Sequence, residues 1–281
     1  MTNTKRFAGR TAIITGASRG IGAGIAERLA AEGADIAITA RTYESHPSLP
    51  GSLKETAERC EQYGNKVEII VADLADEDSR AEIVPIAVTA LGPIDILVNN
   101  AAAAIYQPIH EYPLKRRRLM TEINIQAPID LTQAVLPGMI ERGQGWIVNV
   151  SSGSARLPDP NPPYDLGGVR GTYGFYGATK AMLNRLTQAL ASENHHHGVR
   201  VNTIEPKHAV MSEGADKLVG DMLTEDQIES LEAMVEATLI LCDCDRDHTG
   251  RIEASLDLLD ERGATVMTLD GAGAHPGGYR R

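Results

Sequence analysis

The chain has 281 residues, of which 42% are hydrophobic and 23% charged, a balance typical of a folded globular protein rather than a disordered one. Its 27 Lys and Arg against 38 Asp and Glu give a formal net charge of −11, and aromatic residues make up 4%. An acidic chain with few aromatic side chains is a poor candidate for nucleic-acid binding. Three cysteines are too few for a disulfide framework and favour a reducing compartment.

The N-terminal segment, MTNTKRFAGR, is polar and lacks the apolar stretch of a signal peptide. No window of the sequence approaches the roughly 20 apolar residues that a membrane-spanning helix needs. We therefore expect a soluble, cytoplasmic protein with no membrane partner.

Short apolar runs alternate with longer amphipathic stretches along the whole chain. The runs predict strands at Thr11–Thr15, Asp35–Ala40, Val67–Ala72, Ile94–Val98, Trp146–Val150, Val199–Ile204 and Thr265–Leu269. The amphipathic stretches predict helices at Ile21–Glu32, Gly51–Tyr63, Glu77–Leu91, Leu114–Arg142, Tyr173–His196 and Glu225–Cys242. Strands that are continuous Val and Ile runs are typical of a parallel sheet covered on both faces. The sequence predicts one α/β domain over residues 1–281, doubly wound and Rossmann-type, with a seven-stranded parallel sheet.

Three long irregular segments follow predicted strands, at Thr42–Pro50, Gly153–Thr172 and Pro206–Gly220. In open α/β sheets, ligands bind outside the carboxyl ends of the strands. Long loops in a compact domain are usually functional or disordered. We expect the loops at 153–172 and 206–220 to border a substrate.

The first strand is followed by a glycine-rich turn that opens the first helix, Gly16-Ala17-Ser18-Arg19-Gly20-Ile21-Gly22. Glycines let the backbone approach a pyrophosphate, and the helix N-terminus offers free N–H groups to it. An ordinary turn is the alternative, but the strand–turn–helix context favours a dinucleotide site. The second strand ends in Thr39-Ala40-Arg41-Thr42, without the carboxylate that NAD sites usually place there. Arg41 and Arg19 can instead neutralise a 2′-phosphate, which favours NADP(H) over NAD(H) unless both are merely solvated.

Tyr176 and Lys180 lie four residues apart in a predicted helix and so share one face. A nearby ammonium favours the phenolate, which would lower the tyrosine pKa and give an acid and base for proton transfer. The predicted strand at 146–150 ends in Ser151 and Ser152, whose hydroxyls can hydrogen-bond a substrate oxygen. Each feature alone also fits a structural role, a helix-surface pair or a turn cap.

Taken together, the motifs resemble those of the short-chain dehydrogenase/reductase family. The matching segments are TGASRGIG at 15–22, Asp73-Leu74, NNAA at 99–102, Asn124, the strand-end serines and YGATK at 176–180. They occur in family order over nearly the whole chain. The SHPSLPGSL segment at 45–53, the NNAAAAIYQP run and the long turn after the sixth strand are similar to the hydroxysteroid dehydrogenase-like branch.

The resemblance implies roles for individual residues. Tyr176 would be the proton donor or acceptor, Lys180 would hold the nicotinamide ribose, Ser152 would orient the substrate oxygen and Asn124 would anchor a proton-relay water. The cofactor contacts that the motifs and the resemblance imply are Gly16, Ser18, Arg19, Gly20, Ile21, Gly22, Arg41, Asp73, Leu74, Asn100, Tyr176, Lys180 and Ser212.

The chain also departs from the family pattern. Ala102 replaces a glycine, and Pro206-Lys207 stands where Pro-Gly is usual. The interval between Ser152 and Tyr176 is 24 residues, about twice the usual length, so the intervening loop must fold away for the two hydroxyls to meet.

Pro128 lies four residues after Asn124 inside a predicted helix. Because proline has no N–H, the Asn124 carbonyl loses its helical partner, and a kink is expected there. One hypothesis is that Pro128 exposes this carbonyl to the relay water; the alternative is a kink for packing alone.

Two clusters are not interpreted as metal sites. His195-His196-His197 cannot readily direct three adjacent rings at one ion, and Cys242-Asp243-Cys244 has no second Cys/His cluster beside it in the sequence. We expect no metal. Lys115–Arg118 (KRRR) is either a solvated face or a docking patch for an anionic substrate.

Three functions remain open. The leading one is an NADP(H)-linked oxidoreductase for a secondary alcohol or ketone on a hydrophobic small molecule of steroid, terpenoid or alicyclic type. The second is a 3-oxoacyl-carrier-protein reductase, which the −11 charge disfavours because acyl carriers are acidic. The third is a non-catalytic NADP(H)-binding sensor. The resemblance also implies a homo-oligomer, a tetramer or dimer.

Overall fold

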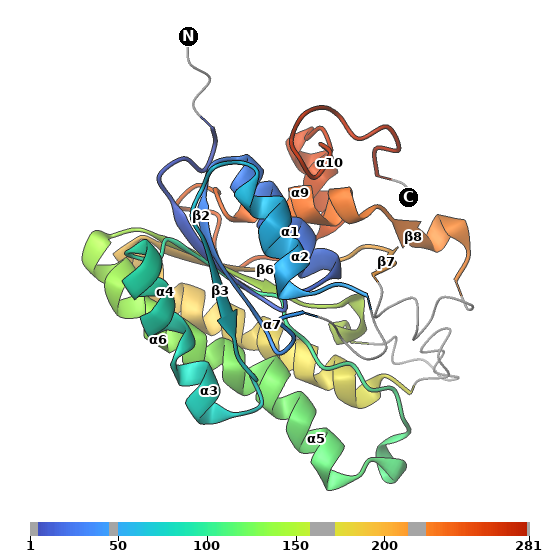
Figure 1. Ribbon diagram of the computed structural model, residues 1–281. Coiled ribbons are helices and arrows are strands. Elements are labelled where there is room, and N and C mark those ends of the chain that lie inside the picture. The colour runs from blue at the N-terminus through green and yellow to red at the C-terminus, as the bar shows by residue number, and fades with distance from the viewer. Residues whose placement is uncertain (1–4, 45–49, 158–171, 213–222, 280–281) are drawn as a thin grey trace.

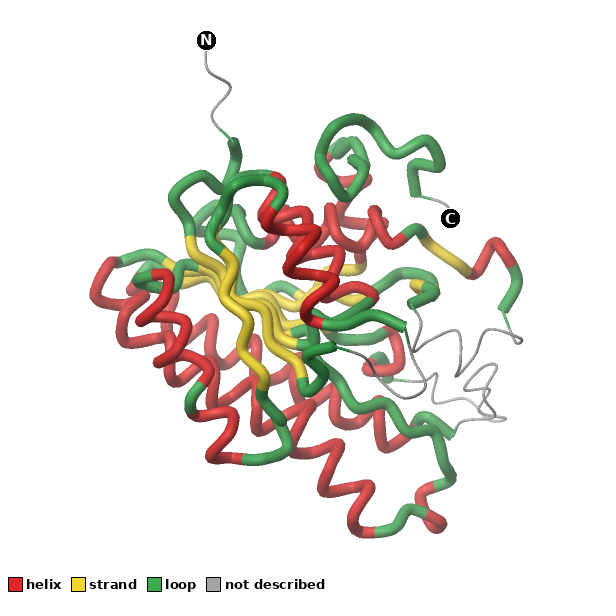
Figure 2. Tube along the Cα trace, viewed as in Figure 1, coloured by secondary structure: helices red, strands yellow, loops and turns green. Residues whose placement is uncertain are grey.

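The computed structural model describes residues 5–44, 50–157, 172–212 and 223–279. Seven parallel strands form one twisted sheet in the order β3-β2-β1-β4-β5-β6-β9. Helices cover both faces of the sheet, as Figures 1 and 2 show. The predicted fold class, a doubly wound α/β domain of Rossmann type, is confirmed.

The strands of the large sheet are β1 Thr11–Thr15, β2 Asp35–Ala40, β3 Val67–Val71, β4 Ile96–Asn99, β5 Gly145–Val150, β6 Val199–Glu205 and β9 Ile252–Ala254. A small second sheet pairs β7 Ala209–Val210 with β8 Ile228–Glu229. The α-helices are α1 Gly20–Ala31, α2 Leu53–Glu61, α3 Glu77–Ala81, α4 Ile83–Leu91, α5 Leu114–Thr121, α6 Ala127–Arg142, α7 Gly174–Asn194, α9 Leu231–Leu241 and α10 Ser255–Arg262. Short 3₁₀ turns occur at Ile109–Glu111, Gly153–Ala155, His195–His197 and Glu225–Gln227.

The central strands are buried on both faces, because every residue of β1, β4 and β5 is buried. One core lies between the sheet and α1, α2, α9 and α10, and a second lies between the sheet and α4, α6 and α7. The apolar runs of the sequence therefore fill two cores that share one sheet. This arrangement leaves the carboxyl ends of the strands free to carry loops.

A buried ion pair joins the first helix to a late one. Arg28 on α1, 3% exposed, donates through Nη1 to Glu236 Oε2 on α9 at 3.0 Å, and its Nη2 lies 2.7 Å from Glu32 Oε1. A buried charge is costly unless it is paired, so this contact fixes the register of the two helices. It anchors the helix whose first turn is the glycine-rich segment.

The single tryptophan lies near the amino end of β5. The indole Nε1 of Trp146 donates to the Cys244 carbonyl at 3.0 Å. The guanidinium carbons of Arg10 and Arg200 lie 4.3 and 4.7 Å from the ring centroid, within the range of cation–π contacts. The ring is 3% exposed and belongs to the core.

The predicted seventh strand was wrong in position. Thr265–Leu269 forms no strand of the sheet; Met267 makes an isolated antiparallel bridge with Ala274, and Val266 packs into the core. The seventh position is taken by β9, which pairs with β6 through Thr203↔Ile252 to Glu205↔Ala254. Three residues of mixed polarity carry no periodic signal, whereas the apolar 265–269 run imitates one.

Two predicted helices are interrupted, each near a proline. The stretch 77–91 divides into α3 and α4 at Glu82, and Pro85 removes the N–H that would bond the Ala81 carbonyl. The stretch 114–142 contains a π-helical turn at Glu122–Gln126, directly before Pro128 in α6. The Ala127 N–H bonds the Glu122 carbonyl, five residues back, so the chain widens there instead of running as one α-helix.

Near the C-terminus, the predicted helix Glu225–Cys242 begins later than expected, at Leu231. Helix α10 was not predicted. Within the part of the chain that the structure describes, no helix combines the length and apolar character required to cross a membrane.

A pair of glycines gives a test of the backbone geometry. Gly143 and Gly198 both have left-handed φ angles, of +66° and +75°. A Cβ at Gly143 would meet nothing within 4 Å, whereas one at Gly198 would collide with the Gly143 carbonyl oxygen. We expect Gly143→Ala to lower the free energy of unfolding by about 1 kcal/mol. Gly198→Ala should lower it by at least twice as much, because backbone must move as well.

Denaturant unfolding of the two variants beside the unmodified chain measures both values. Equal losses would show that the close approach of the 143 and 198 turns does not constrain the fold.

Candidate active site

The turn after β1 is shaped for close approach of the backbone. Gly16 and Gly20 have left-handed φ angles of +67° and +53°. A Cβ on Gly22 would lie 2.5 Å from the Gly16 carbonyl oxygen, so no other residue fits there. Ile21, between them, packs its side chain against the core under α1. The turn therefore exposes backbone at the N-terminus of α1, where N–H groups favour an anion.

Thr15 and Asn100 tie this turn to the end of β4. Asn100 Nδ2 donates to the Thr15 carbonyl at 2.8 Å and to the Gly16 carbonyl at 3.3 Å. The Thr15 hydroxyl accepts the backbone N–H groups of Asn100 and Ala101, each at 3.0 Å. Two strand ends are thus held against each other.

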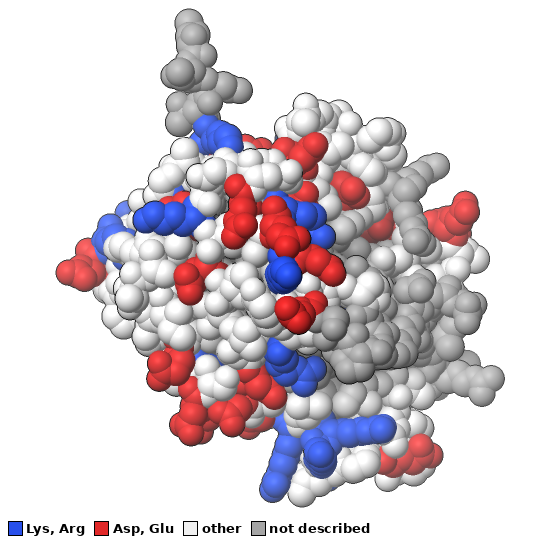
Figure 3. Space-filling model, in the orientation of Figure 1, with Lys and Arg blue, Asp and Glu red and all other residues white. Residues whose placement is uncertain are grey.

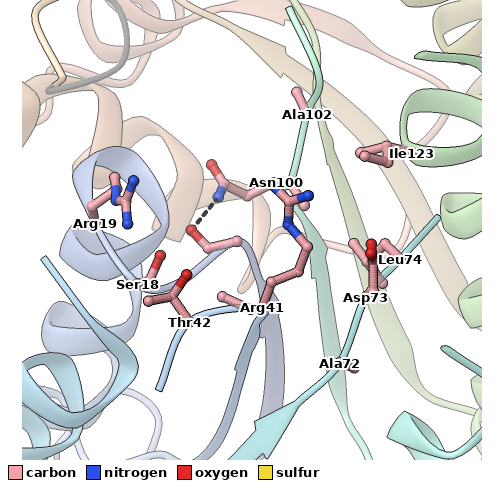
Figure 4. Close-up of a pocket in the computed structure, with 13 residues that line it drawn as sticks. Ser18, Arg19, Arg41, Thr42, Ala72, Asp73, Leu74, Asn100, Ala102 and Ile123 are labelled. Atoms are coloured by element: carbon pink, nitrogen blue, oxygen red, sulfur yellow. Dashed lines mark hydrogen bonds between the residues drawn. The ribbon is translucent and has the colours of Figure 1, made fainter. Parts of the chain in front are cut away.

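A cavity of about 330 Å³ opens beside this turn. It is bordered by the ends of β1, β2, β3 and β4, as Figure 4 shows. The predicted cofactor residues that line it are Gly16, Ser18, Arg19, Arg41, Asp73, Leu74 and Asn100. Ala102, which replaces the family glycine, also lines it.

The two arginines that were predicted to meet a 2′-phosphate both line this cavity. Arg41 extends from the end of β2 into it, and Arg19 lies at the start of α1 (Figure 4). Arg19 Nη2 donates to the Gly51 carbonyl at 3.2 Å, while its Nε is buried without a hydrogen-bond partner. The cavity-lining ends of β2 and β3 present one carboxylate, Asp73, whose Oδ1 accepts the Ala75 N–H at 3.0 Å. This donor set fits a phosphorylated nucleotide.

Ser152 and Tyr176 are 24 residues apart in the sequence but lie near each other in the structure. Ser152 follows β5 and Tyr176 lies in the first turn of α7, close enough for the Ser152 hydroxyl to lower the pKa of Tyr176. The Ser152 Oγ also accepts the Ser154 N–H at 3.2 Å. Gly177 lets α7 pack against this turn, because a Cβ there would strike the Ser154 carbonyl oxygen.

Lys180 is 2% exposed, and its Nζ donates to the Val150 carbonyl at 2.7 Å. The same Nζ lies 6.0 Å from the centroid of the Tyr176 ring. Burial lowers the pKa of Lys180 to about 8. Burial likewise raises the pKa of Tyr176 above its ordinary value, aided by the nearby Tyr106 and opposed by the Ser152 hydrogen bond. In this structure desolvation outweighs the lowering of the tyrosine pKa that the sequence predicted.

Asn124 lies in the π-helical turn and is fully buried. Its Oδ1 accepts the Ala103 N–H at 2.8 Å, and its Nδ2 donates to the Ala103 carbonyl and to Thr179 Oγ1, each at 3.0 Å. The side chain thus joins the segment after β4 to α7. Thr179, one residue before Lys180, was not singled out from the sequence.

Tyr106 is a second residue that sequence reasoning missed. Its ring lies 5.7 Å from the Tyr176 ring and 6.4 Å from the Tyr173 ring, centroid to centroid. Tyr176 also packs in a small apolar cluster with Tyr112, Met120 and neighbouring side chains. The NNAAAAIYQP run contained the signal: an aromatic residue shortly after the strand that carries Asn100.

The two predicted substrate loops are described only in part. Residues 158–171 of the first and 213–220 of the second lie outside the described residues. The described portions are the turn at Gly153–Ala155 that follows Ser152 and the segment through Ser212 that follows β6. The Ser212 N–H donates to the Val210 carbonyl at 2.8 Å, and Ser212 does not line the cavity beside Gly16.

The remaining clusters lie apart from this cavity. Lys115–Arg118 is exposed at the start of α5, where Figure 3 shows a group of basic side chains. The ring centroids of His196 and His197 lie 3.8 Å apart with the rings tilted by 43°, and the three cysteines are buried. Among the described residues, no group of three or more His, Cys, Asp or Glu side chains is arranged to hold a metal ion.

Comparison with known proteins identifies the family. The family model for short chain dehydrogenase matches residues 10–222. A hydroxysteroid dehydrogenase-like protein 2 of Xenopus tropicalis is 32% identical over 283 residues, covering 99% of this chain and 63% of that protein. The chain thus spans somewhat less than two thirds of the length of this relative.

Solved structures agree with the family match. A short chain dehydrogenase of Mycobacterium thermoresistibile superposes with a TM-score of 0.78 at 31% identity, covering 92% of this chain and 89% of the other. A metagenomic short-chain oxidoreductase in complex with NADP gives 0.70 at 26% identity over 88% and 96% of the two chains. A Mycobacterium paratuberculosis short chain dehydrogenase bound to NAD gives 0.74 at 26% over 89% and 97%. With the family model matching most of its length, the chain belongs to the short-chain dehydrogenase family, on the hydroxysteroid dehydrogenase-like branch.

Proposed function

We propose that the chain catalyses reversible hydride transfer between NADP(H) and a secondary alcohol or ketone of a hydrophobic small molecule. The observation that carries the proposal is the convergence of Ser152, Tyr176 and Lys180 at the carboxyl end of β5. A steroid-, terpenoid- or alicyclic-type substrate suits the apolar surroundings of Tyr176, which include Tyr112, Met120, Ile105 and Phe175.

The cofactor would be held from two sides. The glycine turn and the N-terminus of α1 would bind the pyrophosphate, Asp73 and Leu74 would border the adenine, and Arg19 and Arg41 would pair with a 2′-phosphate. The unpartnered Nε of Arg19 supports this assignment, since a buried donor without an acceptor is costly. Lys180, Asn100 and Ser212 would border the nicotinamide ribonucleoside.

Proton transfer is assigned to the protein. The bound nicotinamide supplies the hydride chemistry when present. In ketone reduction, the Tyr176 O–H donates its proton to the carbonyl oxygen as the carbonyl carbon gains the hydride, and Ser152 hydrogen-bonds the same oxygen. Alcohol oxidation reverses both movements. The Lys180 ammonium, 6.0 Å from the centroid of the Tyr176 ring, would stabilise the phenolate that results.

Asn124 would complete the proton path. Its side chain is fully used in holding Ala103 and Thr179, so the backbone carbonyl is the group left for the relay water. Pro128 cannot supply the α-helical N–H to that carbonyl. The π-helical turn at 122–126 supports this reading over a kink for packing alone.

We further propose that residues 1–281 act as one NADP(H)-binding domain and that the chain forms a homo-oligomer. Exposed apolar side chains on α5 and α7, Leu114 at 52% and Met182 at 50%, support association through those helices.

Replacing Tyr176 by Phe removes the transferable proton and leaves the ring in place. We expect turnover of any ketone substrate to fall at least a hundredfold, because general acid–base catalysis contributes about 10²–10⁴. NADPH binding, followed by fluorescence titration, should persist. Tyr63→Phe is the control, because that hydroxyl is buried without a partner on the α2 side of the molecule. Near-normal turnover by the Tyr176 variant would contradict the assigned proton donor.

The cofactor preference is tested at the end of β2. Arg41→Ala should lower kcat/KM for NADPH by about tenfold to a hundredfold, as expected for loss of hydrogen bonds to a charged group, and change that for NADH little. Arg59→Ala, which removes an arginine paired with Glu27 outside the cavity, should leave the ratio unchanged. An unmodified enzyme that prefers NADH would refute the preference.

The buried ammonium of Lys180 predicts a pH effect on stability without cofactor. Folding depresses its pKa from 10.5 to about 8, so at pH 7 the folded state carries the cost of a buried charge that the unfolded state does not. Lys180→Met should therefore be inactive yet more stable at pH 7, by up to about 3 kcal/mol.

The advantage should shrink as pH rises from 8 to 10.5, because the folded wild type releases its proton before the unfolded chain does. Denaturant unfolding of both proteins from pH 7 to 10.5 measures this difference. A constant difference across that range would show that the ammonium carries no burial cost.

A further inference from the structure

The segment after β6 begins beside the residues assigned to proton transfer. β5 and β6 pair through Val150↔Ile204, and the Ser151 N–H donates to the Ile204 carbonyl at 2.8 Å. The Val150 carbonyl also accepts a hydrogen bond from the Lys180 ammonium at 2.7 Å. Whatever fixes the backbone from Pro206 onward therefore fixes one wall of the region around Ser152 and Lys180.

A buried carboxylate far along the chain holds this backbone. Glu229, the second residue of β8, is 1% exposed. Its Oε2 accepts the His208 N–H at 3.0 Å, and its Oε1 accepts the hydroxyl of Ser255 at 2.6 Å. Ser255 Oγ in turn accepts the Lys207 N–H at 2.9 Å. Two consecutive backbone N–H groups are thus fixed by one carboxylate and one hydroxyl.

The residues that follow His208 are held by strand pairing. Ala209 and Val210 of β7 pair in parallel with Ile228 and Glu229 of β8. The Val210 carbonyl then accepts the Ser212 N–H at 2.8 Å. Side-chain hydrogen bonds at Lys207 and His208 and backbone pairing at Ala209 and Val210 thus together hold the segment that leads to Ser212.

The network of Glu229 and Ser255 costs free energy, because it buries a carboxyl group and a hydroxyl to hold one turn of backbone. Burial raises the pKa of Glu229, and the hydrogen bonds from the His208 N–H and the Ser255 hydroxyl oppose that rise. Ser255 is itself fully buried. The family's usual Pro-Gly is Pro206-Lys207 here, and the network holds the Lys207 N–H.

We propose that Glu229 is a positioning residue for the nicotinamide end of the cofactor. Together with Ser255 it fixes the backbone of Lys207–Val210 and, through it, Ser212 beside the nicotinamide ribonucleoside. Glu229 itself touches neither cofactor nor substrate. This proposal rests on the proposed function, because Ser212 is a cofactor contact only in that reading.

The test compares two ligands. NADP⁺ spans both ends of the site, whereas adenosine 2′,5′-bisphosphate occupies only the adenosine end at the cavity of Arg19 and Arg41. For Glu229→Gln and for Ser255→Ala, calorimetric titration should show Kd for NADP⁺ raised about tenfold, as loss of a buried hydrogen bond implies. Kd for the bisphosphate should change less than twofold. A purely structural role would weaken both ligands alike, or neither.

The matched control is Asp257→Asn. Asp257 holds the side chain of the same Lys207 through an exposed ion pair of 2.8 Å, with the two side chains 36% and 58% exposed. Exposed pairs contribute little, so this variant should bind both ligands as the unmodified chain does. A tenfold effect from Asp257→Asn as well would assign the loss to the Lys207 side chain and overturn the proposal.

Steady-state kinetics separate this proposal from the proposed function. With a ketone substrate, Glu229→Gln should raise KM for NADPH about tenfold, and the shape of the pH profile should be retained because Tyr176 is untouched. If Tyr176→Phe is inactive and Glu229→Gln has normal KM, the reaction stands and the positioning role fails. If no ketone is turned over but NADP⁺ binding responds to Glu229→Gln as described, the positioning role stands and the reaction fails.

Discussion

The close junction between the ends of β1 and β4 determines where everything else at the site can lie. The Thr15 hydroxyl accepts hydrogen bonds from two backbone N–H groups that follow β4. The Asn100 side-chain amide donates to the carbonyls of Thr15 and Gly16. A side chain on Gly22 would collide with the carbonyl oxygen of Gly16. A larger residue at Gly16 or Gly22 would push the turn away from β4 and fill the space that opens toward Arg19 and Arg41.

Much of the fold follows from burial patterns that the sequence displays openly. β1 and β2 coincide with their predicted runs because each has an apolar centre, Ala12–Ile14 and Ile36–Ile38, that is buried between neighbours in the sheet. Prolines explain the errors within helices, since Pro85 and Pro128 each deprive a carbonyl four residues back of its partner. The sequence shows both prolines, yet it does not say whether the chain breaks, as at Glu82, or widens, as at 122–126. Tertiary packing decides between them.

The residues of the site likewise divide into those that local sequence predicts and those that it does not. Motif residues lie where local sequence places them: Tyr176 and Lys180 on one helix face, Ser152 at a strand end, and Arg41 after β2. Glu229 and Tyr106 could not be predicted, because their significance comes from contacts with segments that no local pattern connects. Glu229 meets His208 across 21 positions, and Tyr106 meets Tyr176 across 70. The protonation balance of Lys180 and Tyr176 was also beyond the sequence, since it depends on how completely α7 buries them.

The surroundings of Trp146 have a spectroscopic consequence. The indole lies near the amino end of β5 with guanidinium groups against it, whereas Ser152 lies past the other end of that strand, six residues or roughly 20 Å away. Because the chain contains one tryptophan, its indole emission has a single origin within the sheet. That emission reports the integrity of the core around β5.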